Sequence, residues 1–451
     1  MASSATVDPP PASPVVILLT GVTGFLGKVV LEELVRRKNA GSLHYDRLVV
    51  LIRAARGKSP TERFQDKVIK SGCFSRLPEG WAKHIEVISG DLMEAACGIE
   101  SATRDELIQN ITHILHCAGC VAFDSSLNVL LAENVTASVN ILELAQHSPA
   151  LRRLILTPAQ QILDDLHEGR KAPDEIIAET GHPNYYTLAK CLAEHVVAQK
   201  MGNTPLTFVR PSIISASMRY PFPGWIDSFA ALAGPMAAFA LGGLKVLHGD
   251  PAAILDVVPV DEVAKCIINE ALFPPVYGNV DRRNLNEKSR IVHCVSTKKN
   301  GPSTWDICFE TIAYFEQPEN TVLYKPHGYY IGTDDRWFYF YEFIYQYLPI
   351  KLSELAALMM LDWKGAAKAR KTLERLGQVD THFRYFVENT YDYRSAVPVL
   401  EGDFDRKKYL QIVLQGVRQN LLLPLMAREK ARAIQQTGPE PKKEDAPGIV
   451  R

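Results

Sequence analysis

Short runs rich in apolar residues recur through the first half of the chain. They occupy residues 15–19, 47–52, 85–88, 111–116, 153–156 and 206–209. A continuous run, unlike an alternating one, is typical of a strand that is covered on both faces of a parallel sheet. The pattern therefore predicts a buried parallel sheet built from these segments.

Between these runs, the apolar residues change to helical spacing. In residues 28–37 they fall at Val29, Val30, Leu34 and Val35, and further helices are expected around residues 59–71, 134–147 and 187–201. Strands that alternate with helices predict the α/β class. We expect a doubly wound parallel sheet of the Rossmann type.

The pattern changes after residue 212, where prolines interrupt the chain, and a mostly helical region runs from residue 301 to 428. We predict a Rossmann-type domain with an appended region for the substrate over residues 15–300. A smaller, mostly helical C-terminal domain covers residues 301–428. Disordered tails are expected over residues 1–14, which are rich in Ala, Ser and Pro, and over residues 429–451, which are charged.

Composition narrows the class of protein. The 451 residues carry a net charge of −1, which gives no argument for a nucleic-acid partner. Eight scattered cysteines are typical of reduced thiols in a cytoplasmic protein. Cys117 and Cys120 form a CxxC pair without two further ligands, so no metal site is predicted. No apolar run reaches the roughly 18 residues of a membrane-spanning helix.

A glycine-rich turn follows the first strand and opens the first helix. Its glycines, Gly21, Gly24 and Gly27, allow a tight turn, a close approach to a pyrophosphate and close packing of helix on strand. The helix N-terminus offers free N–H groups to phosphates. We expect this turn to bind a dinucleotide through Thr20, Gly21, Thr23, Gly24, Phe25, Leu26 and Gly27.

The end of the second strand selects between the two nicotinamide cofactors. An acidic residue there would bind the ribose 2′-hydroxyl, but this strand ends in Arg53, followed by Arg56 and Lys58. A basic cluster suits a 2′-phosphate, so NADPH is favoured. The alternative is an ordinary solvated run of charges.

Tyr186 and Lys190 form a YxxxK motif on a predicted helix. Residues four apart share one helix face, so the phenol and the ammonium can meet. A nearby cation lowers the pKa of a phenol and helps it to protonate a developing alkoxide. The motif predicts carbonyl reduction; the alternative is a tyrosine and a lysine on a helix surface.

The glycine spacing and the YxxxK motif together resemble the extended branch of the short-chain dehydrogenase/reductase superfamily. The resemblance implies that Tyr186 and Lys190 also contact the cofactor. It implies further cofactor contacts after the third, fourth and sixth strands and at the start of a helix, namely Asp91, Leu92, Cys117, Ala118, Gly119, Asn134, Pro211, Ser212 and Ile213.

The resemblance also implies a catalytic hydroxyl just after the fifth strand, and Thr157 is the candidate. Relatives commonly have Ser-Thr-Ala-Tyr in this region, whereas this chain has Thr-Pro-Ala-Gln. If the hydroxyl of the family lies one position later, Pro158 has replaced it. Gln160 could then donate to the oxyanion instead.

Several motifs are similar to those of the fatty acyl-CoA reductases. They are GFLGK at residues 24–28, VAFD at 121–124, RPSII at 210–214, PGWID at 223–227 and GDP at 249–251. The resemblance spans roughly residues 15–425 and is looser after residue 265. It implies reduction of a long-chain acyl-CoA to the fatty alcohol with two NADPH and release of coenzyme A. The alternatives are an aldehyde-forming reductase, an extended reductase of sterols or sugar nucleotides, and a non-catalytic NADP-binding module.

Two apolar stretches bear on substrate and membrane. Residues 229–241 could line an acyl tunnel or pack in an ordinary core. Residues 337–361 hold eight aromatic residues before Pro349 and then a Leu- and Met-rich segment. They could lie in a membrane interface, as the resemblance implies. A buried helix of the second domain is the favoured interpretation. The sequence does not determine the oligomeric state.

Overall fold

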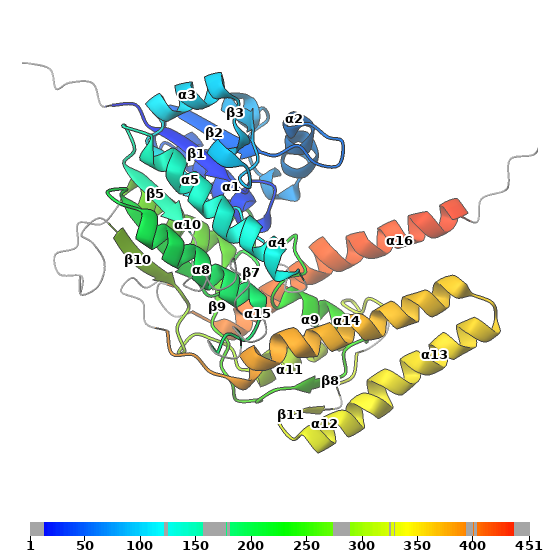
Figure 1. Cartoon of the computed structure of the whole chain (residues 1–451). Helices are drawn as coiled ribbons and strands as arrows, with labels where there is room; N and C mark the ends of the chain where they lie inside the picture. Colours follow the sequence, from blue (N-terminus) through cyan, green and yellow to red (C-terminus); the bar gives the residue numbers. More distant parts are fainter. Residues whose placement is uncertain are drawn as a thin grey trace, which may run out of the picture.

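A seven-stranded parallel sheet forms the core of the N-terminal part of the protein (Figure 1). The computed structural model describes residues 13–120, 125–156, 177, 181–273, 289–323, 326–328, 330–393, 400 and 404–436. The strand order is β10-β6-β5-β4-β1-β2-β3. The strands are β1 (Val16–Thr20), β2 (Arg47–Ile52), β3 (Ile85–Ser89), β4 (His113–His116), β5 (Arg153–Leu156), β6 (Leu206–Pro211) and β10 (Ser289–Cys294).

This order confirms the predicted Rossmann-type sheet. From β1 the chain adds β2 and β3 on one side, and it then crosses back to place β4 on the other side of β1, so the direction of winding reverses between β1 and β4. Ligands of such folds bind at the carboxyl ends of the strands beside this switch point. All six predicted strands are present, and β10 adds a seventh beside β6.

Helices cover both faces of the sheet, as the continuous apolar strands require. Helices α1 (Phe25–Asn39) and α10 (Val260–Leu272) share one core cluster with the strands. Helices α3 (Ser101–Asn110), α5 (Ala137–Gln146) and α8 (Tyr185–Lys200) contribute to a second cluster on the opposite face. Strand β1 is buried at all five positions between the two clusters.

The appended region packs with the C-terminal helices in a core of its own. Strands β7 (Ile213–Ser215) and β9 (Val257–Pro259) pair, and β8 (Val246–His248) pairs with β11 (Tyr330–Gly332). Helix α9 (Ala233–Ala240) shares one cluster with α11 (Thr304–Glu316) and α15 (Arg406–Gly416). The buried residues of α9 therefore serve core packing, one of the two alternatives for residues 229–241. The boundary predicted at residue 300 crosses this shared core.

A helical hairpin projects from this second core (Figure 1). It comprises α12 (Asp335–Glu342), a π-helical turn η6 (Phe343–Tyr347), α13 (Leu348–Met359) and α14 (Trp363–Glu388). Gln346 anchors its base, because its Oε1 accepts from the backbone N–H groups of Lys245 and Val246 at 2.7 and 2.8 Å. Glu354 joins α13 to α14 by accepting from Lys351 and Arg370.

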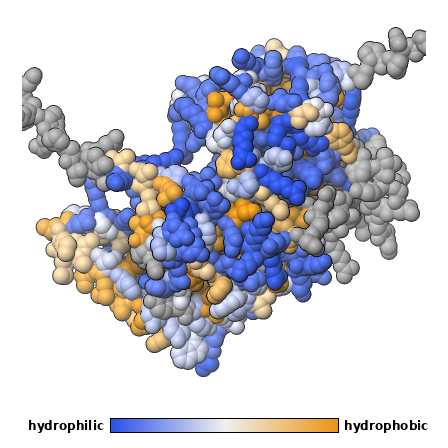
Figure 2. Space-filling view, turned by 180° about the vertical axis from the view of Figure 1, so that it is seen from behind, coloured by the Kyte–Doolittle hydropathy of each residue, from blue (hydrophilic) through white to orange (hydrophobic). Residues whose placement is uncertain are grey.

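The expectation of a buried helix over residues 337–361 is wrong. The outer side of the hairpin exposes large apolar side chains, and Met360 at its tip is 80% exposed. Figure 2 shows this apolar surface in orange at the lower left. Its exposed members are Trp337, Tyr339, Phe340, Phe343, Tyr347, Leu352, Leu355, Met359, Met360, Leu361 and Trp363, which we call the hairpin patch. Apolar composition does not reveal whether other elements cover a segment.

The last described helix, α16, covers Leu423–Gln436. It continues eight residues beyond the boundary predicted at 428 for the helical domain, because charged residues on an exposed helix resemble a charged tail in sequence. Short connecting helices of the Rossmann part include α2 (Pro60–Phe64), which continues into the π-helical turn η1 (Gln65–Ile69), and α4 (Leu127–Leu131), which continues into the π-helical turn η5 (Ala132–Thr136). Three 3-10 turns, η2 (Gly72–Phe74), η3 (Trp81–His84) and η4 (Ala95–Gly98), also lie in this part. Among the described residues, no helix combines the length and the hydropathy needed to cross a bilayer.

Candidate cofactor and active site

The glycine-rich turn leaves no space for side chains. Gly21 has a φ of +79°, and a Cβ there would lie 2.6 Å from the backbone nitrogen of Ala118. A Cβ on Gly27 would lie 2.1 Å from the carbonyl oxygen of Gly21. Helix α1 begins after Gly24, and no side chain caps its N-terminus. Its first N–H groups can therefore bind a phosphate.

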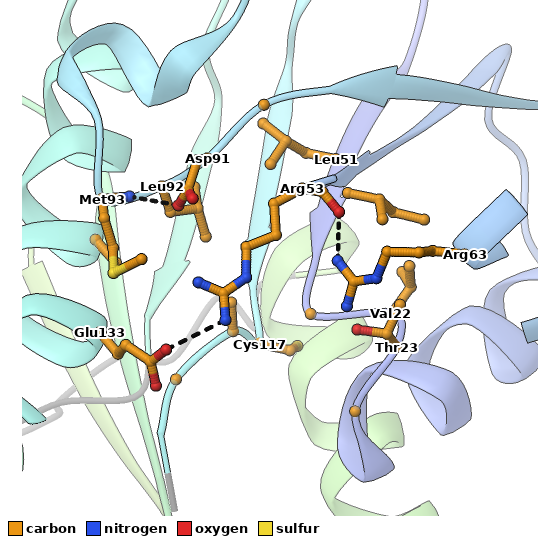
Figure 3. A pocket seen from close by; sticks show the side chains of 17 residues that line it. Val22, Thr23, Leu51, Arg53, Arg63, Asp91, Leu92, Met93, Cys117 and Glu133 are labelled. Atoms are coloured by element: carbon orange, nitrogen blue, oxygen red, sulfur yellow. Dashed lines mark hydrogen bonds and ion pairs between the residues drawn. The ribbon is translucent and has the colours of Figure 1, made fainter. Parts of the chain in front are cut away.

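A pocket opens at the carboxyl ends of β1 to β4 (Figure 3). Nine of the expected cofactor residues line it: Gly21, Thr23, Gly24, Arg53, Asp91, Leu92, Cys117, Ala118 and Gly119. Val22, Leu51, Ile52 and Gly90, which belong to the same predicted segments, also line it, and the structure adds four residues that sequence reasoning did not identify, namely Arg63, Met93, Glu133 and Ala137. The pocket has the position that a dinucleotide occupies in this type of fold.

Basic residues gather at one side of the pocket. The Arg63 guanidinium, from α2, donates to the carbonyl oxygen of Arg53. Burial and the neighbouring charges of Arg53 and Arg56 lower the pKa of Arg63. Arg56 is exposed and does not line the pocket, and Lys58 pairs with Asp66 instead. Arg63, the cation that the structure adds, lies ten residues after Arg53 in the sequence, so only the fold brings the two side chains to the same side of the pocket.

Thr20 and His116 fix the ends of β1 and β4 behind the pocket. The His116 Nδ1 lies 2.9 Å from Thr20 Oγ1, and that oxygen accepts from the N–H of Ala118 at 3.4 Å. Burial lowers the pKa of His116 to about 3, so its imidazole is neutral near pH 7. Thr20 is fully buried and shapes the turn rather than lining the pocket.

Tyr186 and Lys190 lie one turn apart near the start of α8. The helix begins at Tyr185 because the side chain of Asn184 caps it by accepting from the N–H of Thr187 at 2.9 Å. Burial raises the pKa of Tyr186 to about 12, the reverse of the lowering expected from a nearby cation, and lowers the pKa of Lys190 to about 8. The phenol therefore remains protonated near pH 7, and the ammonium loses its proton easily.

Lys190 and Asn134 meet beside Gly119 at the edge of the pocket. A Cβ on Gly119 would lie 2.8 Å from Lys190 Nζ and 2.9 Å from Asn134 Oδ1, so only glycine leaves room for both groups. Asn134 belongs to the π-helical turn η5, a distortion that is frequent at functional sites. Its Nδ2 donates to the carbonyl oxygen of Leu130 at 2.9 Å. Its buried Oδ1 has no partner among the described residues.

The remaining expected residues lie elsewhere. Thr157, Pro158, Gln160 and the 121–124 segment are outside the described residues. Pro211 ends β6 and Ile213 begins β7. Between them, the Ser212 hydroxyl donates to Asp256 at 2.5 Å. Ser212 thus links two segments of the chain and does not line the pocket. Phe25 and Leu26 pack against the core between α1 and the sheet.

Comparison with known proteins identifies the family of the chain. A family model described as male sterility protein matches residues 19–267. A Mus musculus protein named fatty acyl-CoA reductase 2 is 31% identical over 342 residues, which cover 69% of this chain and 64% of that protein. A Gallus gallus protein named fatty acyl-CoA reductase 1 is 27% identical over 407 residues, which cover 83% of this chain and 75% of that protein. The chain thus spans slightly under two thirds of the mouse relative.

Solved structures share the fold. The terminal R domain from the myxalamid PKS-NRPS biosynthetic pathway superposes with a TM-score of 0.59 at 20% identity, over 94% of this chain and 93% of that domain. The family model spans the glycine-rich turn, the pocket and the Tyr186–Lys190 helix, which is more than half of the sequence. The chain therefore belongs to the male sterility protein family, the family of the fatty acyl-CoA reductases.

Proposed function

We propose that this protein is an NADPH-dependent reductase of long-chain fatty acyl-CoA that forms the fatty alcohol and releases coenzyme A. The observation that carries the proposal is the junction at Gly119. This residue lines the dinucleotide pocket and at the same time adjoins Lys190, so the pocket and the proposed proton donors meet there. The fatty acyl-CoA reductases among the relatives supply the substrate class.

The residues of the pocket fit a nicotinamide dinucleotide. Gly21 and Gly27 leave a cradle that any Cβ would fill, and the start of α1 offers free N–H groups to the pyrophosphate. Arg53 and Arg63 would hold the 2′-phosphate, which favours NADPH over NADH. When bound, the reduced nicotinamide supplies a hydride to the acyl carbon.

Tyr186 acts as the proton donor in this proposal. Its phenol remains protonated because its pKa is about 12, so it can donate to the oxygen that becomes negative as the carbonyl is reduced. Lys190 stabilises that oxygen as a cation and orients the phenol. Thr157, which lies outside the described residues, is the proposed third donor.

The conversion of a thioester to an alcohol requires two reductions, each of which adds one hydride and one proton. The first adds one hydride and one proton to the thioester, and the product loses coenzyme A as the thiol to give an aldehyde. The second adds one hydride and one proton to that aldehyde and gives the alcohol. Tyr186 would supply the proton in both, since the same carbonyl oxygen position is used each time.

The test is to mix the protein with NADPH and acyl-CoA from octanoyl to stearoyl and to measure both NADPH loss and products. Alcohol formation is expected, whereas accumulation of aldehyde would mean a single reduction. No NADPH loss with any acyl-CoA would reject the proposal. Turnover of a keto-steroid or a sugar nucleotide would then identify the protein as an extended reductase of that substrate class. A Tyr186→Phe variant should bind NADPH without turnover.

We also propose that the hairpin patch rests on a membrane surface from the cytoplasmic side. The patch is exposed and apolar, and the exposed lysines Lys364, Lys368 and Lys371 follow it directly on α14. An apolar surface bordered by basic residues suits an interface with anionic lipids. The cytoplasmic location is supported by the eight unpaired cysteines.

A further inference from the structure

An ion pair crosses the cofactor pocket. Arg53 leaves the end of β2, and Glu133 comes from the π-helical turn η5 on the opposite wall. The Arg53 Nη2 and the Glu133 Oε1 lie 3.2 Å apart, and both residues line the pocket. Figure 3 shows the two side chains reaching toward each other between the walls.

The two carboxylates that line this pocket face different partners. Asp91 turns back to its own loop and accepts from the N–H of Met93 at 3.1 Å. Glu133 instead faces Arg53, which is also the cation proposed to hold the 2′-phosphate. Glu133 therefore acts directly on the basic cluster, whereas Asp91 does not.

We propose that Glu133 competes with the 2′-phosphate of the cofactor for Arg53, and so lowers the affinity of this protein for NADPH relative to NADH. The inference rests on the proposed use of NADPH. The 2′-phosphate and the Glu133 carboxylate are both anions, and both would accept hydrogen bonds from the Arg53 guanidinium. Glu133 occupies one edge of the guanidinium, so a 2′-phosphate that takes that edge displaces Glu133 and leaves its carboxylate beside the phosphate without its partner.

Binding of NADH does not require the ion pair between Arg53 and Glu133 to open. Its 2′-hydroxyl is a neutral group, so Arg53 can stay paired with Glu133 while NADH occupies the pocket. The effect of Glu133 should therefore depend on the 2′-phosphate and should pass through Arg53. A general repulsion between Glu133 and the cofactor would act on both dinucleotides, because both carry the pyrophosphate.

The exposure of the ion pair allows an effect through Arg53 to be distinguished from a general repulsion by mutation. The side chains of Arg53 and Glu133 are 43% and 27% exposed, so the pair contributes little to folding and both can be replaced in an intact protein. Glu143, on α5, offers a matched control because it is exposed and does not line the pocket. Its replacement removes the same charge from the same stretch of helix.

The experiment is calorimetric titration of NADPH and NADH into the full chain and its Glu133→Gln, Arg53→Gln, double and Glu143→Gln variants. Glu133→Gln should tighten NADPH binding about three- to fivefold, and should change NADH binding by less than about twofold. The gain should vanish when Arg53 is already Gln, and Glu143→Gln should have no effect.

Equal gains for NADPH and NADH, a gain that persists with Arg53→Gln, or no gain with Glu133→Gln would each overturn the inference. The wild-type protein tests the proposed function separately. If it does not prefer NADPH to NADH, the proposed cofactor fails and the inference falls with it. If it prefers NADPH and Glu133→Gln changes nothing, only the inference fails. No acyl-CoA is needed, so the choice of substrate does not affect the result.

Discussion

The ring of Phe25 stacks on the indole of Trp225, with the ring centroids 5.3 Å apart and the planes inclined by 25°. One turn further along α1, the Lys28 ammonium pairs with Asp227. Phe25 and Lys28 belong to the glycine-rich motif, and Trp225 and Asp227 belong to the PGWID segment. These two contacts join the helix that begins at the cofactor turn to the region proposed for the substrate.

Asp227→Asn should destabilise the protein more than Lys28→Met. Lys28 is 8% exposed and Asp227 is 29% exposed, so the asparagine variant leaves a buried cation without its counter-ion. Removing one partner of a buried pair costs about 3 kcal/mol. Lys28→Met leaves only a carboxylate that water can reach. Urea denaturation of both variants measures the difference, and an equal or larger loss for Lys28→Met would contradict it.

The strands of the sheet could be predicted because burial on both faces requires continuous apolar runs. Strand β10 was missed because it lies at the sheet edge, where Ser289, Arg290 and His293 interrupt the apolar pattern. The glycine turn could be recognised because steric demands fix its glycines at set spacings. The fold alone brings Arg63 and Glu133 to the pocket, and no local pattern marks either residue.

The exposure of the hairpin patch illustrates a different limit. Periodicity shows that residues 337–361 can form an apolar helix, but burial depends on whether another element packs against it. Gln346 and Glu354 are buried in this segment while Met359 and Leu361 are exposed, which reverses the usual relation of polarity and burial. Such an inversion is a property of the tertiary structure.

Glu32 should make the stability of the protein depend on pH. Its side chain is 1% exposed, and burial raises its pKa from 4.5 to about 7. A raised pKa means that the folded state binds the proton more tightly than the unfolded state. The stability that this tighter proton binding adds is fully present below about pH 4.5, and it is lost as the pH rises through about 7.

The Glu32→Gln variant should therefore gain stability relative to wild type as the pH rises from 5 to 8, by about 2–3 kcal/mol. Chemical denaturation at both pH values gives the free energies of unfolding, and the difference between variant and wild type isolates Glu32 from other titrating groups. A difference that stays constant with pH would show that Glu32 does not titrate in this range.

Lys190 should limit activity at alkaline pH. Burial lowers its pKa to about 8, so the ammonium that stabilises the reacting oxygen in our proposal is lost as the pH rises through that value. Above about pH 8, the kcat/KM for NADPH-dependent reduction should fall with rising pH, by no more than about tenfold for each pH unit. In a Lys190→Arg variant, any remaining activity should not show this fall, because guanidinium stays charged. An unchanged pH profile in that variant would assign the titration to another group.

Arg63 and Arg56 offer a comparison of two arginines from the same basic cluster. Arg63 lines the pocket, whereas Arg56 does not, although the sequence favoured Arg56. Arg63→Ala should weaken NADPH binding about tenfold, since it removes a charged hydrogen-bond donor, and should leave NADH binding nearly unchanged. Arg56→Ala should have a smaller effect. Fluorescence titration of both cofactors provides the test, and a larger loss for Arg56→Ala would place the 2′-phosphate outside the pocket.

The hairpin patch should carry the protein to lipid vesicles. Met360 and Leu361 are 80% and 72% exposed at the turn between α13 and α14, so a charge there stays in water in the free protein but would have to enter the lipid interface on binding. A Met360→Glu, Leu361→Glu variant should lose vesicle binding by more than about tenfold, through lost apolar burial and repulsion from anionic lipid.

Flotation with vesicles of phosphatidylcholine and phosphatidylserine measures this binding. The control is Leu323→Glu, which adds a charge at a 59% exposed leucine outside the hairpin and should float like the wild type. Replacing Lys364 and Lys368 with glutamate should weaken binding only when phosphatidylserine is present, because the basic residues act on lipid charge. If the wild type stays with the soluble fraction whether or not phosphatidylserine is present, the membrane proposal is rejected, and a protein surface becomes the alternative that so large an exposed apolar area indicates.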